Sequence, residues 1–172
     1  VPLMMLACIA AVIWVSTSHV QTLAVQTQQE SAVFAGLARQ MKLGIVQVQQ
    51  WLTDISATRG RDGLADGFDE AQASYQSFSE NLSRFETMYR QENDTSGLAQ
   101  VETLRADAAA YYATGKKMAQ AYIDGGPELG NQIMGEFDMA AVKLTECLDP
   151  FVASQTQELD SNMTSIVGAI SG

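Results

Sequence analysis

The stretch Gln47–Gly60, which reads QVQQWLTDISATRG, decides how this chain folds. It carries Val48, Leu52 and Ile55 at alternating steps of four and three, a spacing that gathers apolar side chains along one side of a helix. The pattern stops at Gly60, and glycine is well suited to ending a helix. The stretch therefore predicts the last turns of a long amphipathic helix.

The same heptad spacing recurs in four segments, which are separated by turn-rich runs around residues 60–67, 93–97 and 125–127. The first segment continues the pattern of the opening stretch, and the fourth contains Pro150, which should kink or break it. Four such segments joined by short turns predict an all-α, antiparallel up-down-up-down four-helix bundle. The predicted core positions are Phe34, Leu37, Met41, Ile45, Val48, Leu52, Ile55, Leu64, Phe68, Ala71, Tyr75, Phe78, Leu82, Phe85, Tyr89, Leu98, Val101, Leu104, Ala108, Tyr111, Gly115, Met118, Tyr122, Leu129, Ile133, Phe137, Ala140, Leu144, Leu148, Phe151, Leu159, Met163, Ile166 and Ile170.

The two ends of the chain have features of membrane helices. Residues 2–15 are apolar and uncharged, so we expect residues 1–15 to be a truncated transmembrane helix, with a cleaved signal peptide as the alternative. All 10 Lys and Arg residues lie between Arg39 and Lys143, so residues 1–38 and 144–172 contain none. Segments next to a membrane helix that lack Lys and Arg are typical of the outer side of the membrane. We expect residues 16–172 to be extracytoplasmic, with long first and last helices continuing to the membrane and a second membrane helix beginning near the end.

Composition excludes several classes of function. A net charge of −10 and a pI near 4.4 disfavour binding to nucleic acid, which requires a basic surface. Cys8 and Cys147 form no CxxC motif and are expected to be unpaired, buried thiols. His19 is the single histidine and lies beside the apolar run, so no nucleophilic triad or His-ligated site is expected elsewhere. The sequence predicts no enzyme activity, no cofactor and no metal site.

The helical pattern, the QVQQWLTDISATRG stretch and the segment GNQIMGEFD (residues 130–138) resemble the sensor domain of bacterial methyl-accepting chemotaxis proteins. The resemblance covers the chain from about Ser16 onward. It implies a homodimeric, periplasmic four-helix bundle in the inner membrane, with much of the dimer contact made by the first helix. It also implies that a ligand shifts the fourth helix and thereby controls a cytoplasmic kinase.

Within that resemblance, the aspartate and serine receptors hold amino acids with arginines from the first helix and polar groups from the fourth. This sequence matches loosely through Arg59 and Arg61 and lacks a spaced arginine trio. The alternatives are a sensor domain of a membrane histidine kinase or diguanylate cyclase, and a dimerisation bundle that senses nothing.

An antiparallel bundle would bring the end of the first helix to the same apex as the start of the fourth. Arg59 could hold a carboxylate or amino acid there through a bidentate contact, or could instead pair with a neighbouring Asp. Acidic residues crowd the same end and could favour an amine or a metal ion. The expected ligand-binding residues are Thr58, Arg59, Arg61, Tyr111, Tyr112, Asn131, Met134 and Asp138.

Several of these residues have a purely structural alternative. Tyr111 and Tyr112 are favoured as bundle packing with wet hydroxyls, and Asn131 and Asp138 as caps or solvated first-turn residues. A second stripe on the first helix contains Gln47, Trp51, Asp54 and Thr58 at steps of four, three and four. This stripe is interpreted first as the dimer face, with Gly44 allowing close approach, and otherwise as a ligand lining or a solvated flank.

Overall fold

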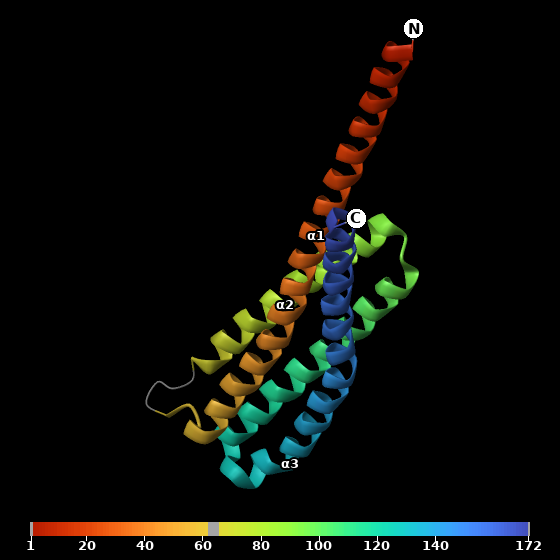
Figure 1. Ribbon diagram of the computed structural model, residues 1–172. Coiled ribbons are helices and arrows are strands. Elements are labelled where there is room, and N and C mark those ends of the chain that lie inside the picture. The colour runs from red at the N-terminus through yellow and green to blue at the C-terminus, as the bar shows by residue number, and fades with distance from the viewer. Residues whose placement is uncertain (1, 62–65, 172) are drawn as a thin grey trace. The chain divides into compact units, whose positions relative to one another are not determined.

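The computed structural model describes residues 2–61 and 66–171, with side chains for residues 25, 28–61 and 66–168 (Figure 1). The described residues form three helices, α1 (Pro2–Thr58), α2 (Gly67–Glu92) and α3 (Thr95–Ser171), and contain no strand. The all-α prediction is confirmed. Within the described part of the chain, no helix contains a stretch long and apolar enough to cross a membrane.

α3 contains a reversal of the chain at Gly126, where φ is 62° and ψ is −155° while the neighbouring residues are helical (Figure 1). This conformation lies in a region of the Ramachandran plot that only glycine adopts readily. The predicted division between a third and a fourth helical segment is therefore found at Gly126, inside α3. Pro150 also lies within α3, whose non-helical φ/ψ falls at Gly126, so of the kink or break expected at Pro150 the break is absent.

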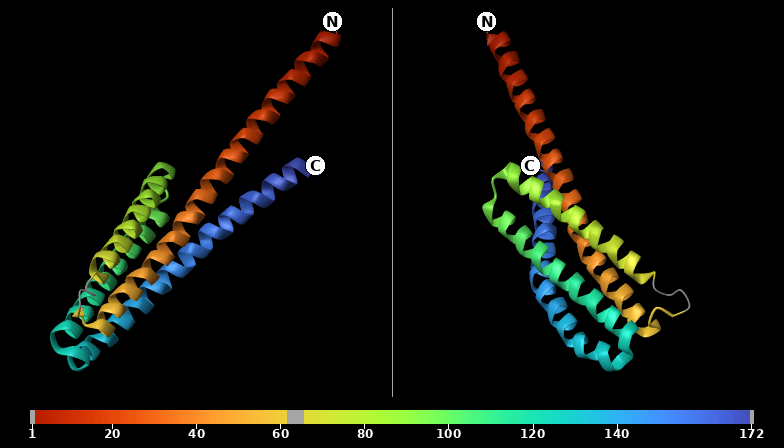
Figure 2. Two further views of the ribbon diagram at one scale, coloured as in Figure 1. Left: turned by 90° about the vertical axis from the view of Figure 1, so that its left-hand side faces the viewer. Right: turned by 180° about the vertical axis from the view of Figure 1, so that it is seen from behind.

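The chain divides into two compact units, one of residues 36–153 and one of residues 1–35 with 154–172. In the first, which we call the four-segment unit, the end of α1, all of α2 and two stretches of α3 lie side by side (Figure 2). In the second, which we call the two-helix unit, the Nδ2 of Asn162 donates to the Oγ of Ser31 at 2.7 Å. Ser31 and Gln155 are buried there.

Contacts between α2 and α3, and between the two stretches of α3, show in which direction these segments run. Tyr75 of α2 stacks on Tyr112 of α3 at a centroid distance of 4.4 Å, and Glu86 of α2 pairs with Arg105 of α3 at 2.6 Å. Residue numbers rise along α2 as they fall along α3, so these two segments run in opposite directions. Across the reversal, Asp107 pairs with Lys143 at 2.7 Å and Lys117 pairs with Glu136 at 3.3 Å, so the two stretches of α3 also run in opposite directions.

Buried side chains of the four-segment unit follow the predicted heptads. Their largest fully buried members are Tyr111, Phe78, Phe85, Phe137, Met41, Leu52, Ile55, Leu82, Leu104, Met118, Leu144 and Val48. Two predicted core positions are wrong, because Leu129 is 41% exposed and Met163 is 45% exposed. Leu64 and Ile170 lie outside the residues whose side chains are described. Partly exposed core positions include Phe68 and Leu98, each in the first turn of its helix.

Aromatic rings fill the centre of this core. Phe137 stacks on Tyr111 at a centroid distance of 4.8 Å, and Phe85 meets Phe151 edge to face at 4.8 Å. Gly115 faces the first of these pairs, because a Cβ added there would lie 2.6 Å from Leu52 and 2.7 Å from the Phe137 ring. The absence of a side chain at residue 115 therefore lets α1 and both stretches of α3 approach one another closely.

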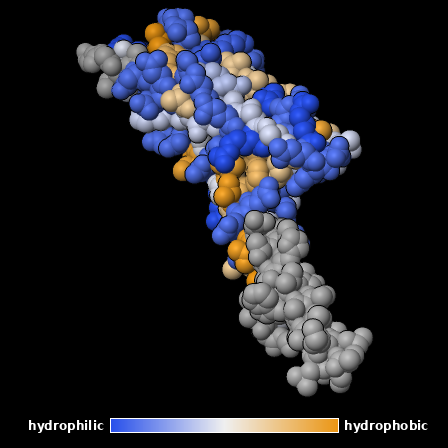
Figure 3. Space-filling model, turned by 90° about the horizontal axis from the view of Figure 1, so that it is seen from above, coloured by the Kyte–Doolittle hydropathy of each residue, from blue (hydrophilic) through white to orange (hydrophobic). Residues whose placement is uncertain are grey.

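The coloured part of the face shown in Figure 3 is mainly hydrophilic, with apolar residues among the polar ones. The larger exposed apolar side chains of the four-segment unit are Leu43, Val46, Leu129, Met139 and Val142. They lie on α1 and on the second stretch of α3, whereas α2 has no large exposed apolar side chain among its described residues.

Candidate ligand site

α1 ends at Thr58 in a turn with two consecutive residues in the left-handed conformation, Arg59 (φ 55°) and Gly60 (φ 60°). The Arg59 N–H still donates to the carbonyl of Ile55 at 2.7 Å. The Thr58 hydroxyl donates to the same carbonyl at 3.4 Å and accepts from the Gly60 N–H at 3.3 Å. The predicted helix end at Gly60 is thus confirmed to within two residues.

α2 begins directly against α1 because its first residue is a glycine. A Cβ added to Gly67 would lie 2.8 Å from the carbonyl oxygen of Trp51 and 2.9 Å from Cγ1 of Ile55. Asp66 precedes α2, and its carbonyl accepts from the N–H groups of Asp69 and Glu70 at 3.0 and 3.2 Å. Its carboxylate makes no capping hydrogen bond.

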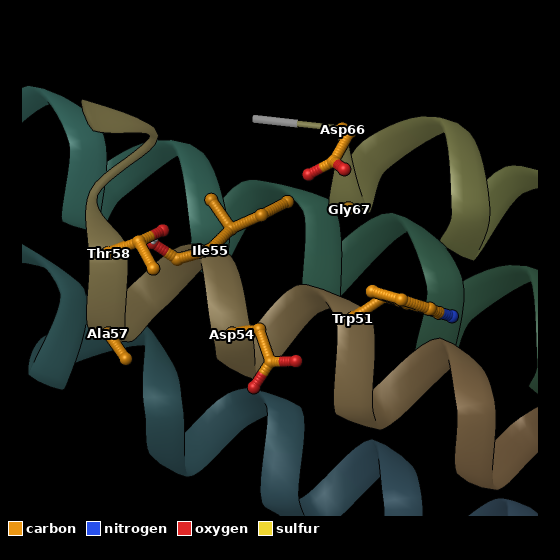
Figure 4. Close-up of a pocket in the computed structure, with 7 residues that line it drawn as sticks. All are labelled: Trp51, Asp54, Ile55, Ala57, Thr58, Asp66 and Gly67. Atoms are coloured by element: carbon orange, nitrogen blue, oxygen red, sulfur yellow. Dashed lines mark hydrogen bonds between the residues drawn. The ribbon is translucent and has the colours of Figure 1, made fainter. Parts of the chain in front are cut away.

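An open hollow of about 280 Å³, which we call the Trp51 hollow, lies beside these two helix ends (Figure 4). Its lining residues come from the last two turns of α1 and the first residues of α2. They are Trp51, Asp54, Ile55, Ala57, Thr58, Asp66 and Gly67. The opening stretch of the sequence analysis therefore supplies most of the lining.

The Trp51 hollow combines an aromatic ring with two carboxylates. Trp51 is half-buried, whereas Asp54 and Asp66 are exposed. Within the described part of the chain, neither carboxylate has a salt bridge or a side-chain hydrogen bond. No lysine or arginine is among the described lining residues. The lining therefore combines two negative charges with an aromatic ring.

Two residues predicted for a dimer interface, Trp51 and Asp54, line the hollow. Gln47 is exposed on α1. The prediction that Gly44 lies at the dimer face is wrong, because Gly44 is buried and faces α2. A Cβ added there would lie 3.3 Å from the carbonyl oxygen of Ser74. The close approach that this glycine permits is between α1 and α2 of the same chain.

The guanidinium of Arg59, the leading predicted ligand contact, lies against Gly126 at the reversal of α3. A Cβ added to Gly126 would lie 3.1 Å from Cζ of the Arg59 guanidinium. Arg59 is half-buried and forms no salt bridge with any described residue. Arg61 is exposed. Of the predicted ligand-binding residues, only Thr58 lines the Trp51 hollow.

Tyr111 and Tyr112 are buried in the helix packing, as the structural alternative predicted, but the hydroxyl of Tyr111 is buried and not wet. Tyr111 is fully buried, and its hydroxyl donates to the carbonyl of Ile45 at 3.4 Å. Burial raises the pKa of the Tyr111 hydroxyl well above its ordinary value. Tyr112 lies between the Tyr75 ring and the ammonium of Lys116, which is 4.5 Å from the ring centre. Burial also raises the pKa of Tyr112.

The remaining predicted ligand residues lie on the second stretch of α3. Asn131 is exposed and accepts a hydrogen bond from the Tyr122 hydroxyl. Asp138 is exposed and Met134 is half-buried. None of the three lines the Trp51 hollow, so this hollow does not bring the predicted ligand residues together.

A buried carboxylate that the sequence did not single out is Asp107, which is 5% exposed. Lys143 pairs with it at 2.7 Å, and the Cys147 thiol donates to it at 3.7 Å. The hydrogen bond to Asp107 raises the pKa of Lys143, while burial raises the pKa of the Cys147 thiol. Cys147 is a free thiol, as predicted, but it is half-buried where a buried thiol was expected. The side chains of Cys8 and His19 lie outside those described. Among the described residues, no group of three His, Cys, Asp or Glu side chains is arranged to hold a metal ion.

Comparison with protein-family models, with curated proteins and with solved structures found no match to this chain.

Proposed function

We propose that this chain is the ligand-sensing, periplasmic domain of a bacterial transmembrane receptor in the inner membrane, of the kind that controls chemotaxis. The observation that carries the proposal is the Trp51 hollow at the end of α1, a helix that continues without interruption from Thr58 back to Pro2. A small molecule bound at Trp51 and Asp54 acts on the same helix that we propose continues to the membrane. The output is passed to a cytoplasmic signalling domain through α1 and the second stretch of α3.

The proposed architecture is an antiparallel up-down-up-down four-helix bundle of residues 36–153, with the reversal at Gly126 separating the third and fourth helices. Support comes from the heptad positions that form the buried core and from the opposite directions of paired segments. Such bundles place ligand sites between the ends of helices or between facing helices. The Trp51 hollow, at the junction of α1 and α2, has a location of this kind.

The proposed anchoring and orientation rest on the sequence. Residues 1–38 and 144–172 contain no lysine or arginine, and the first residues are apolar. We propose that both ends of the chain lead into membrane helices, which would hold the sensor in the periplasm.

We propose that the receptor is a homodimer held by α1. Leu43 and Val46 are 56% and 52% exposed on this helix, on the side away from the buried seam, and Gln47 is exposed next to them. Apolar side chains that stand one turn apart on an exposed helix face suit packing against a second copy. Gly44, which faces α2, is excluded from this interface.

A thermal-shift screen tests whether the chain binds a small molecule. The whole chain would be screened against carboxylates, amino acids, amines and metal ions. A ligand present at about 100 times its dissociation constant stabilises the folded state by about 2.7 kcal/mol. In a protein of this size that corresponds to a rise in Tm of roughly 5–10 °C. We expect at least one class to give such a rise, and a panel in which no compound does so would contradict the sensor proposal.

A further inference from the structure

The lining of the Trp51 hollow bears directly on the class of ligand. It contains two carboxylates, an indole, one hydroxyl and the apolar side chains of Ile55 and Ala57 (Figure 4). The Thr58 hydroxyl is already engaged, since it donates to the carbonyl of Ile55 and accepts from the N–H of Gly60. The groups left for a ligand are therefore the Asp54 and Asp66 carboxylates and the face or edge of Trp51.

From this lining we infer that the Trp51 hollow binds a small organic cation, such as a primary or quaternary ammonium ion. The inference rests on the proposed sensor function and names its ligand class. An ammonium ion is attracted both by a carboxylate and by the face of an indole, which is the strongest of the aromatic partners for cations. The volume of about 280 Å³ suits a ligand of a few heavy atoms.

A carboxylate ligand is disfavoured at this position. An anion in the hollow would meet Asp54 and Asp66, which have no cationic partner among the described residues. The guanidinium of Arg59 lies instead against Gly126, on α3. Like charges at short range repel, and the overall charge of −10 adds to this repulsion.

A metal ion is also a poorer fit than an organic cation. Hard divalent cations take about six or more oxygen ligands, whereas the described lining offers two carboxylates beside an aromatic ring and two aliphatic side chains. No three metal-binding side chains among the described residues come together. An organic cation, by contrast, uses the aromatic and aliphatic part of the lining as well as the acidic part.

Nuclear magnetic resonance titration of the whole chain tests this inference. The chain has two tryptophans, Trp14 and Trp51. In a chain that carries Trp14→Phe, the remaining indole N–H signal therefore belongs to Trp51. The sample would be kept in a non-ionic detergent, because zwitterionic lipids carry ammonium groups. The probes are tetramethylammonium chloride, tert-butanol as its neutral isostere, sodium propionate as the anion, and sodium chloride at matched ionic strength.

We expect tetramethylammonium to shift the Trp51 indole signal saturably, while the three other probes do not. Asp54→Asn and Asp66→Asn should each raise the dissociation constant roughly three- to ten-fold, since each removes one charge beside the bound cation. Asp69→Asn is the matched control. Asp69 is an exposed residue in the first turn of α2 that does not line the hollow, and its substitution should change the constant less than about two-fold.

Three results would overturn the inference. The first is an equal shift with tert-butanol, and the second is a dissociation constant unchanged by both Asp54→Asn and Asp66→Asn. The third is saturable binding of propionate without binding of tetramethylammonium, which would leave the sensor proposal standing while removing the cation. Because both aspartates are exposed, we expect the circular dichroism spectra of the variants to match that of the parent chain. The comparison of tetramethylammonium with its neutral isostere requires no variant in the hollow.

Discussion

Gly126→Ala is expected to lower the free energy of unfolding by about 1–3 kcal/mol. The reversal inside α3 requires φ 62° and ψ −155° at this residue, a conformation that side chains with a Cβ strongly disfavour. The new methyl group would also lie 3.1 Å from Cζ of Arg59, so the guanidinium would have to move. The substitution therefore strains the backbone and displaces the end of α1 at the same point.

Gly135→Ala is the matched control for this prediction. Gly135 lies in helical conformation in the second stretch of α3, and an added Cβ would meet nothing within 4 Å. Alanine in a helix interior is favoured over glycine by about 0.5–1 kcal/mol, so this variant should be slightly more stable than the parent. Urea denaturation followed by circular dichroism measures both variants. Equal stability of the two would contradict the assigned conformation of Gly126.

Phe137→Ala is expected to cost about 3–5 kcal/mol of stability. The Phe137 side chain is 1% exposed, stacks on Tyr111 and faces Gly115. Its removal leaves a cavity between α1 and the two stretches of α3, which rigid helices fill only in part.

Met139→Ala is the corresponding control two residues further along α3. Met139 is 67% exposed, and truncating it should change the free energy of unfolding by about 0.5 kcal/mol or less. The difference between the two variants is read from the urea midpoint at constant slope. A Phe137→Ala variant that unfolds at the same urea concentration as Met139→Ala would show that residue 137 is not in the core.

The buried face of each helix could be predicted from the sequence, because burial in packed helices follows a fixed period. Met41, Val48 and Leu52 were expected at the core and are fully buried. The predicted burial of Leu129 was wrong. This residue comes shortly after the reversal at Gly126, where the path of the chain, and not the heptad spacing, determines which side chains are buried. Asp107 was overlooked because a carboxylate is buried only when its partners, here Lys143 and Cys147, come from a distant part of the chain.

The site was less predictable than the core. The sequence identified the end of α1, and Trp51, Asp54 and Thr58 do line the hollow. The hollow also needs Gly67 to bring α2 against the backbone of Trp51, and one sequence carries no signal for that approach. Gly67 had been interpreted only as part of a helix break. Arg59 was singled out because it follows the last heptad positions of α1, but its side chain lies against the reversal at Gly126.

The output of a hybrid receptor tests the central claim of a signalling sensor most directly. This chain would replace the sensor domain of a chemotaxis receptor whose cytoplasmic rod controls a kinase, and kinase activity would be measured as amines, carboxylates, amino acids and metal ions are added. We predict that at least one compound changes kinase activity. Asp54→Asn should shift the effective concentration roughly three- to ten-fold upward, and Asp69→Asn should leave it unchanged. A hybrid that controls the kinase but responds to no compound, or responds identically with Asp54→Asn, would contradict the account.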